Sequence, residues 1–287
     1  MRAFVLLNLL AALAPGPEAA PSRRAAHVII VSEDGLRPDA LAQGHAPVHQ
    51  ELLRRGAHSF VARTIRHAST LPSHASMLSG VGDSRHGLSW NSWKPSRGYI
   101  RVPTIFAEAE QHGMHTAAFV GKRKLEHITP PGTVDKFDRP GYLCKRVVEE
   151  ATRYFLEVKP DLMFVHFSDP DEYGHAEGWM SDRYARGIVD ADRCLGKLVS
   201  ALDESGLAPQ TLLILSADHG GHNHTHSGRT REDLLIPWIA VGPGVRKGYR
   251  IVGAISTVDT AATVLYALGL PIAPDLEGHP ITEIFER

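Results

Sequence analysis

The stretch that decides the fold runs from residue 214 to residue 226 and reads Ile214-Leu215-Ser216-Ala217-Asp218-His219-Gly220-Gly221-His222-Asn223-His224-Thr225-His226. It continues an apolar run, residues 211–215, that predicts a buried parallel strand. Ligands of open α/β sheets bind outside the carboxyl ends of the strands, so we expect the Asp-His pair at such an edge. One carboxylate and four imidazoles within nine residues favour a metal site, and a His-rich loop that binds metal opportunistically is the alternative.

The composition indicates a globular protein with nearly balanced charges and no strong overall electrostatic field. The 287 residues are 43% hydrophobic, enough for one large α/β domain or two small ones. Lys and Arg number 31 against 32 Asp and Glu, so nothing favours a nucleic-acid polymer or an anionic membrane as partner. The 17 histidines are unusual. Many stand beside Asp, Gly or Ser, which suits metal ligands better than core positions.

The amino terminus resembles an export signal over residues 1–20. Arg2 is followed by an apolar stretch, 3–14, and then by small residues, and the stretch is too short to span a bilayer. We therefore expect an exported protein, periplasmic or extracellular, without a stable membrane anchor and with a single catalytic domain over residues 26–287. A disordered leader or a mis-assigned start is the alternative. Whether Cys144 and Cys194 pair stays open, as does the oligomeric state.

From residue 27 onward, strand patterns alternate with helix patterns. This alternation predicts an α/β fold, a doubly wound and mostly parallel sheet with helices on both faces. The predicted strands are residues 27–32, 59–65, 116–120, 162–167, 211–215 and 238–241. The predicted helices are residues 38–55, 72–78, 103–112, 144–158, 183–205 and 257–268.

Acidic residues follow three of these strands and should share one edge of the sheet. Asp34 comes directly after the first strand, and Asp218 follows the strand at 211–215. Asp171 and His175 are four residues apart, a spacing that places both on one face of a helix or around a cation in a loop. His226 can return a further ligand. Each acid alone also fits a helix cap or an Asp-rich turn, but three together predict a metal centre.

A hydroxyl stands beside the same edge, in the segment Ser69-Thr70-Leu71-Pro72-Ser73-His74. Pro72 suits the first turn of a helix, which places Thr70 at or just before its amino terminus. A divalent cation would lower the pKa of the Thr70 hydroxyl and make it a nucleophile. The alternative is that Thr70 or Ser69 simply caps the helix.

These motifs together resemble the alkaline phosphatase superfamily, and within it the type I phosphodiesterases and nucleotide pyrophosphatases. The resemblance rests on Asp34-Gly35, Thr70-Leu71-Pro72-Ser73-His74, Asp171 with Gly174-His175, and Asp218-His219-Gly220. It implies two divalent metal ions, for which Zn²⁺ suits the mixed ligands best. The ion that activates the nucleophile would be held by Asp34, Thr70, Asp218 and His219. The ion that faces the leaving group would be held by Asp171, His175 and His226, with His222 and His224 as competitors for the last place.

The resemblance also implies a reaction, hydrolysis of a small-molecule phosphate ester through a phospho-threonine at Thr70. Asn91 resembles the family asparagine that donates to a phosphoryl oxygen, and a turn residue is its alternative. Sulfatases share the scaffold but need Cys or Ser at the position of Thr70, which argues against that activity. No large insertion separates Asp218 from His226, so we expect an open pocket. Four aromatic residues are candidates for its wall: Trp90, Trp93, Tyr173 and Trp179.

A basic segment leaves the type of ester open. Lys122 and Lys124 follow a predicted strand, and their spacing puts both side chains on one side of an extended loop. Such cations would suit the extra negative oxygen of a phosphomonoester or a phosphonate, and a solvated basic loop is the alternative. The family resemblance favours a phosphodiesterase. A non-catalytic exported zinc-binding module is a further hypothesis, but it would not need the Thr70 hydroxyl.

Overall fold

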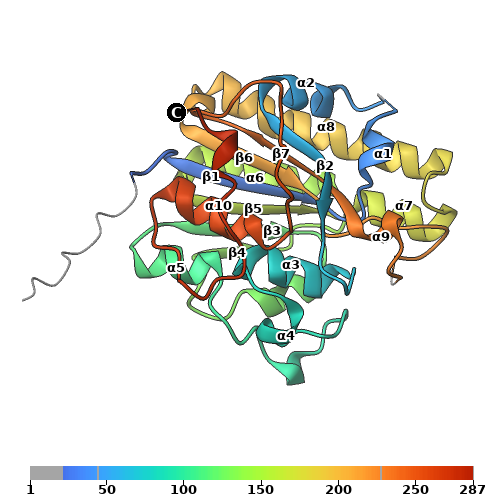
Figure 1. Ribbon diagram of the computed structural model, residues 1–287, viewed down its shortest axis with the longest axis horizontal. Coiled ribbons are helices and arrows are strands. Elements are labelled where there is room, and N and C mark those ends of the chain that lie inside the picture. The colour runs from blue at the N-terminus through green and yellow to red at the C-terminus, as the bar shows by residue number, and fades with distance from the viewer. Residues whose placement is uncertain (1–21, 44, 227, 287) are drawn as a thin grey trace, which may run out of the picture.

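A central sheet organises the computed structural model, which describes residues 22–43, 45–226 and 228–286 (Figure 1). Residues 1–20, for which we predict an export signal, lie outside the described residues. The strands are β1 (His27–Glu33), β2 (Ala57–Arg63), β3 (Thr116–Val120), β4 (Lys136–Asp138), β5 (Leu162–Phe167), β6 (Thr211–Ser216), β7 (Leu235–Val241) and β8 (Tyr249–Arg250).

The described strands form one sheet of eight in the order β4-β3-β5-β1-β6-β7-β2-β8. From β4 to β6 all neighbours are parallel, whereas β7 runs antiparallel to both β6 and β2. The predicted α/β fold with a mostly parallel sheet is confirmed. Its three middle parallel strands, β5, β1 and β6, carry their carboxyl ends to one edge, where parallel α/β sheets place ligands.

Helices cover both faces of the sheet. The α-helices are α1 (Pro38–Leu41), α2 (Pro47–Arg55), α3 (Thr70–Ser79), α4 (Asp83–His86), α5 (Ile105–Gln111), α6 (Cys144–Val158), α7 (Asp169–Glu177), α8 (Asp182–Glu204), α9 (Arg231–Leu234) and α10 (Asp259–Leu268). Short 3-10 helices are η1 (Pro95–Arg97), η2 (Arg123–Ile128), η3 (Ala208–Gln210) and η4 (Thr282–Ile284).

Alternate residues of β1 pack into two separate cores, which is why its run of apolar residues is unbroken. Val28 and Ile30 join the core beneath α3, α5 and α10, and Ile29 and Val31 join the core beneath α2, α6 and α8. All four side chains are fully buried. A strand covered on both faces has no polar side to alternate with, so its sequence reads as a continuous hydrophobic run.

Two differences from the predicted elements have local causes. The helix predicted over residues 38–55 is two helices, because Pro47 begins α2 as its first residue and cannot extend α1. The last predicted strand begins earlier, at Leu235, as the antiparallel partner of β2 and β6. The helix predicted over residues 144–158 has those bounds.

The two cysteines form a disulfide between α6 and α8. Cys144 is the first residue of α6, and Cys194 lies in the middle of α8. Both side chains are buried in the core between these helices. The structure thus decides a pairing that the sequence left open.

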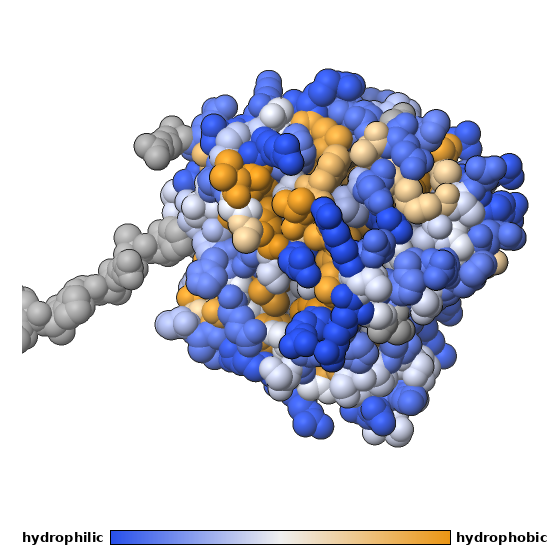
Figure 2. Space-filling view, turned by 45° about the vertical axis from the view of Figure 1, so that its right-hand side comes forward, coloured by the Kyte–Doolittle hydropathy of each residue, from blue (hydrophilic) through white to orange (hydrophobic). Residues whose placement is uncertain are grey.

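Figure 2 shows a hydrophobic area near the middle of one face, surrounded by hydrophilic residues. Among the described residues, no helix has both the length and the apolar content needed to cross a bilayer.

Candidate metal centre

Three carboxylates meet at the edge formed by the ends of β5, β1 and β6. Asp34 follows β1, Asp218 follows β6, and Asp171 lies in the first turn of α7, directly after β5. At most 2% of each residue is exposed. Gly35 turns the chain after Asp34 with a φ of +71°, and a Cβ there would lie 3.0 Å from the Cα of Asp171. Glycine is therefore what allows the ends of β1 and β5 to approach so closely.

Several buried polar atoms at this edge have no hydrogen-bond partner among the described residues. Leaving such an atom unpaired costs about 1–3 kcal/mol, so several in one place indicate a missing partner common to them. The atoms are Asp34 Oδ1, Thr70 Oγ1, Asp171 Oδ1, Asp218 Oδ2 and His219 Nε2. Carboxylate oxygens and an imidazole nitrogen are the donor set that zinc prefers.

The acidic and imidazole side chains of this edge form two groups, within each of which the possible ligand atoms lie within 4.8 Å of one another. The first group comprises Asp34, Asp218 and His219, and the second comprises Asp171, His219 and His226. His219 Nε2 lies 3.4 Å from Asp34 Oδ1 and 3.2 Å from Asp218 Oδ2. Two adjacent groups of this kind are consistent with a binuclear metal site.

The tautomers of the histidines fit metal binding. His219 Nδ1 donates to the carbonyl of Gly220 at 2.8 Å, and His226 Nδ1 donates to the carbonyl of Ala68 at 2.7 Å. His175 Nδ1 donates to the carbonyl of His224 at 2.9 Å. Each Nε2 therefore carries a lone pair, and a backbone carbonyl on Nδ1 is the usual support of a metal-binding histidine.

His175 lies beside the second group. It follows Asp171 by one turn of α7, and its Nε2 lies 3.5 Å from Asp171 Oδ1. Its ring centroid is 5.0 Å from that of His226. The helical alternative for the Asp171–His175 spacing is the one the structure adopts, and it brings both side chains to the same place.

Of the three candidates in the His-rich loop, only His226 reaches the cluster among the described residues. Its Nε2 lies 3.8 Å from Asp171 Oδ1. His222 Nδ1 instead pairs with Asp233 at 2.7 Å. His224 is exposed and hydrogen-bonds the backbone of His175.

Thr70 is the first residue of α3, and its hydroxyl points at no partner. The residue is 1% exposed, and Thr70 Oγ1 has no hydrogen bond among the described residues. Ser69 occupies the N-cap position, but its side chain makes no capping hydrogen bond. Neither the Ser69 nor the Thr70 hydroxyl therefore caps α3.

Asn91 is oriented by two donors. Its Oδ1 accepts hydrogen bonds from the backbone N–H of Leu71 at 3.0 Å and from Lys124 Nζ at 3.1 Å. Because both partners can only donate, the side-chain oxygen must face them, which leaves the amide N–H₂ for another acceptor. Leu71 follows Thr70 directly, so this amide belongs to the same site.

The two lysines differ from the predicted extended loop. Lys122 is extended, but Arg123 begins the 3-10 helix η2, so Lys124 is held in a turn. Lys122 lies between Asp34 and Asp171 and is only 5% exposed, so the alternative of a solvated basic loop is wrong for this residue. Both ammonium groups still border the same pocket.

Two further buried histidines, for which we predicted no role, lie at this edge. His166 accepts the backbone N–H of Gly121 at Nδ1, so its Nε2 donates to Asp34 Oδ2 at 3.0 Å. His74 donates to the carbonyl of Thr70 at 2.7 Å and accepts from Ser32 at 2.8 Å. Burial lowers the pKa of His74 to about 4, so it is neutral. His74 stands in the Thr70 motif, but nothing in the sequence distinguishes His166 within its apolar strand.

The carboxylates buried at this edge are only partly balanced by positive charge. Burial and the neighbouring Asp34 raise the pKa of Asp218 to about 7. Burial opposes ionisation of Asp34 too, but Lys122 and His166 hold its pKa well below the usual range. The protein thus neutralises part of this cluster with its own groups, and a divalent cation would complete the neutralisation.

An open pocket leads to Thr70. Trp93 and Tyr142 supply its aromatic wall, so of the four aromatic candidates only Trp93 lines this pocket. Trp179 is buried instead, and its indole N–H donates to the carbonyl of Gly35 at 2.9 Å. The lining residues are Thr70, Asn91, Trp93, Lys122, Arg123, Lys124, Tyr142, Asp171, Glu172, His175 and His226.

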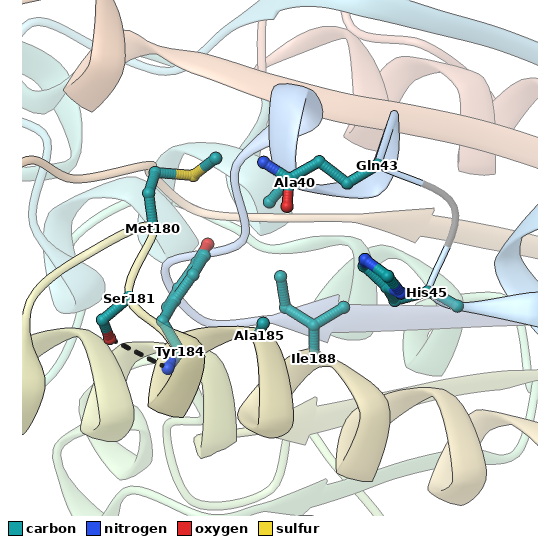
Figure 3. Close-up of a pocket in the computed structure, with 9 residues that line it drawn as sticks. Ala40, Gln43, His45, Met180, Ser181, Tyr184, Ala185 and Ile188 are labelled. Atoms are coloured by element: carbon teal, nitrogen blue, oxygen red, sulfur yellow. Dashed lines mark hydrogen bonds between the residues drawn. The ribbon is translucent and has the colours of Figure 1, made fainter.

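A second pocket lies between α1 and α8 and is separate from this site (Figure 3). Tyr184 forms part of its wall, and the Ser181 hydroxyl accepts the Tyr184 backbone N–H as the cap of α8. The Tyr184 hydroxyl donates to the carbonyl of Gly35 at 2.8 Å. This wall therefore supports the turn that carries Asp34.

Comparison with known protein families gives one match over most of the chain. A family model described as "Type I phosphodiesterase / nucleotide pyrophosphatase" matches residues 28–234. These residues include each candidate metal ligand named above.

Curated relatives are distant and mostly longer. The catalytic subunit of human GPI ethanolamine phosphate transferase 2 is 24% identical over 277 residues, which cover 90% of this chain and 28% of that protein. Venom phosphodiesterase of Naja atra is 25% identical over 215 residues, 67% of this chain and 26% of that protein. Mouse ectonucleotide pyrophosphatase/phosphodiesterase family member 7 is 22% identical over 277 residues, 84% and 63% respectively. The chain thus spans about a quarter of the length of the first two.

Solved structures share the fold at low identity. Murine ectonucleotide pyrophosphatase / phosphodiesterase 5, in an inactive form in complex with AMP, has a TM-score of 0.77 at 16% identity and covers 91% of this chain and 100% of that chain. A phosphonate monoester hydrolase from Silicibacter pomeroyi has a TM-score of 0.70 at 16% identity and covers 91% and 76%. At this identity the likeness shows an alkaline-phosphatase-like fold and no more.

Proposed function

Because the chain belongs to the type I phosphodiesterase / nucleotide pyrophosphatase family of phosphoric-ester hydrolases, within the alkaline phosphatase superfamily, we propose that it hydrolyses phosphate esters with Thr70 as nucleophile. One observation carries this proposal. Among the described residues, the buried Thr70 hydroxyl has no hydrogen-bond partner, and it lines the open pocket beside Asp171, whose Oδ1 is also unpaired. A fold that only needed stability would have paired these atoms.

The residues fit two divalent cations, with Zn²⁺ the best match to the ligand types. Bound there, the cations would stabilise negative charge on the phosphoryl oxygens and lower the pKa of the Thr70 hydroxyl. We propose that the first is held by Asp34, Thr70, Asp218 and His219. We propose that the second is held by Asp171, His175 and His226.

The chemistry assigned to this chain's own residues has two displacements. Thr70 Oγ1 gives its proton to solvent and bonds to phosphorus, while the ester oxygen departs with its electron pair and takes up a proton from solvent, which leaves a phospho-threonine. A water molecule then attacks phosphorus and gives a proton to solvent, while the threonine oxygen leaves with its electron pair and takes up a proton. The Asn91 amide, turned towards the site by Leu71 and Lys124, donates to a phosphoryl oxygen as charge builds there.

The type of ester has two candidates. Family membership favours a phosphodiester or a nucleotide pyrophosphate. Two basic residues at the pocket, Arg123 and Lys124, favour a phosphomonoester or a phosphonate, whose additional negative oxygen would meet their charge. Lys122 also lines this pocket but is already paired with Asp34 and Asp171. An inactive form of murine ectonucleotide pyrophosphatase / phosphodiesterase 5 was solved in complex with AMP, so nucleotide esters belong among the substrates to test.

Export is a further part of the proposal. The Cys144–Cys194 disulfide suits an oxidising compartment and is consistent with the predicted signal over residues 1–20, which leads us to propose a periplasmic or extracellular enzyme.

The test compares zinc-loaded wild type with Thr70→Ala on matched aryl phosphate monoesters and diesters, with a nucleotide aryl ester as a third substrate. We expect Thr70→Ala to lose at least about 1,000-fold in kcat/KM. It should still bind two zinc ions, because Asp34, Asp218 and His219 remain to hold the first. Thr104→Ala is the matched control, because Thr104 is also a buried threonine with an unpaired hydroxyl but lies at the start of α5.

The substrate with the higher kcat/KM decides the type of ester. A wild type that binds two zinc ions and turns over none of these esters would contradict the proposal and favour a non-catalytic zinc-binding module.

A further inference from the structure

Lys122 is a buried cation inside the ligand set. Its Nζ lies 2.8 Å from Asp34 Oδ2 and also hydrogen-bonds Asp171 Oδ2. Asp34 belongs to the first candidate metal group and Asp171 to the second. One ammonium group therefore bridges the two groups.

The two oxygens of each carboxylate face different partners. On both residues the Oδ2 atom meets Lys122. Asp34 Oδ1 lies 3.4 Å from His219 Nε2, and Asp171 Oδ1 lies 3.8 Å from His226 Nε2. Both Oδ1 atoms lack a hydrogen-bond partner among the described residues. The lysine thus occupies one side of the carboxylates and leaves the side facing the histidines free for metal ions.

The backbone fixes the lysine in this position. Gly121, directly before it, donates its N–H to the carbonyl of His166 at 3.2 Å. A Cβ on Gly121 would lie 2.3 Å from the Ser168 hydroxyl and 2.3 Å from the Tyr142 carbonyl. The backbone at Gly121 is therefore packed tightly against the end of β5. This packing fixes the position from which the Lys122 side chain extends to the carboxylates.

The charges around Lys122 are unequal. Three carboxylates face the centre, those of Asp34, Asp171 and Asp218, and Lys122 is the buried ammonium among them. The neighbouring Lys124 is turned to Asn91. A metal ion binds carboxylates in their ionised form. With all three carboxylates ionised and the histidines neutral, three negative charges and one positive charge leave a net charge of −2. One divalent ion would balance this charge, and a second would leave an excess of +2.

We propose that Lys122 is a third, resident cation of the proposed two-metal site, and that it makes the two metal affinities unequal. It stays on the Oδ2 side when metal ions bind through the Oδ1 side. The first ion then binds to a net negative ligand set, whereas the second enters a set that is already neutral. Lys122 also holds Asp34 and Asp171 together in the metal-free protein.

The test is a zinc titration of the metal-free full chain by calorimetry, with wild type, Lys122→Met and Lys124→Met. We expect wild type to bind a first zinc ion at least tenfold more tightly than a second. Lys122→Met should bind the second ion at least tenfold more tightly than wild type does. Lys124→Met is the matched control, since Lys124 contacts Asn91 rather than a ligand carboxylate, and its change should be clearly smaller.

Two results would overturn the proposal: a second affinity unchanged or weakened in Lys122→Met, or an equal gain in Lys124→Met. If Lys122→Met does not fold without metal, Lys122→Gln replaces it in the titration. A second measurement uses wild type alone, labelling lysines by reductive methylation and mapping them by peptide mass spectrometry. Lys122 should resist labelling equally in the metal-free and zinc-loaded protein, and labelling that rises on zinc loading would show that metal displaces the lysine.

This inference rests on the proposed function for its metal ions, but it is tested by binding rather than turnover. Wild type that binds two zinc ions and hydrolyses no ester would contradict the proposed function and leave the role of Lys122 standing. Equal zinc affinities in wild type and Lys122→Met, together with normal ester hydrolysis, would contradict the role of Lys122 and leave the proposed function standing.

Discussion

Glu33 and Asp34 are neighbours in the chain, are both fully buried, and have opposite surroundings. Glu33 faces α2, where its carboxylate lies 3.1 Å from His49 Nε2, and His49 Nδ1 lies 2.7 Å from Asp192 on α8. Asp34 faces the pocket edge, where Lys122 and His166 bind one of its oxygens, and the other has no partner in the part of the chain that the structure describes.

The difference separates two uses of buried charge. In the His49 cluster both ring nitrogens have an acidic partner, and Asp192 also accepts the backbone N–H of His49 at the start of α2. Glu33 Oε2 is the only side-chain atom of these three residues without a partner among the described residues. At the pocket edge, Asp34, Asp171, Asp218 and His219 each keep such an atom. The first cluster holds α2 and α8 against the sheet. The second keeps unpaired ligand atoms, as a site for bound cations would.

Asp34→Asn gives the largest expected effect and separates the two clusters. It removes a charged ligand, so we expect the loss of one bound zinc ion and at least about a 1,000-fold fall in kcat/KM. The melting temperature of the metal-free protein should fall less than in His49→Gln, because the asparagine amide oxygen can still accept from Lys122 and His166, and Asp171 remains a counter-ion for Lys122. Zinc content by metal analysis and melting in chelator provide the measurement. A large fall in melting temperature would mean that Asp34 serves the fold as Glu33 does.

His49→Gln should give the opposite result. It leaves Glu33 and Asp192 buried without their cation, and breaking a buried ion pair costs about 3–5 kcal/mol of unfolding free energy. Urea denaturation at pH 6 measures this loss. Zinc stoichiometry should remain at the wild-type value, and loss of a zinc ion would make the comparison between the two clusters untenable.

The pH dependence of stability is the smallest expected effect. Burial alone would lower the pKa of His49, but Glu33 and Asp192 outweigh it and raise the pKa to about 9, against 6.5 for an ordinary histidine. Protonated His49 therefore stabilises the fold fully below pH 6.5, and this contribution disappears as the pH rises towards 9. It amounts to about 3 kcal/mol. The measurement is urea denaturation of metal-free wild type and metal-free His49→Gln at pH 6 and pH 9.5. The loss of unfolding free energy between the two pH values should be larger in wild type by this amount. An equal loss in both proteins would contradict the prediction.

Strand ends are the part of this molecule that sequence predicts best. The apolar runs before Asp34 and Asp218 and the helical spacing of Asp171 and His175 were enough to place all four at one edge, because parallel strands end together. The choice of His226 over His222 and His224 also agrees with the geometry. What identified the site was the agreement of several short motifs, none of which would be informative alone.

Sequence could not predict the contacts that depend on side-chain direction in three dimensions. Lys122 looked like half of a basic loop, and its place between two carboxylates depends on the tight packing of Gly121 against β5. His49 and Asp192 are 143 residues apart and meet only because α2 and α8 cover the same face of the sheet. His166 is a single polar residue within the apolar strand β5, so only the fold reveals that it turns towards Asp34.

The disulfide makes residues 144–194 a closed covalent ring. Asp171 and His175 lie inside this ring, whereas Asp34, Thr70, Asp218, His219 and His226 lie outside it. The candidate site is therefore assembled across the boundary between a cyclic and a linear part of one chain. A single cut of the backbone within the ring would not divide the molecule into two pieces. The two candidate ligands on α7, Asp171 and His175, would therefore stay covalently linked to the rest of the chain for as long as the disulfide remains.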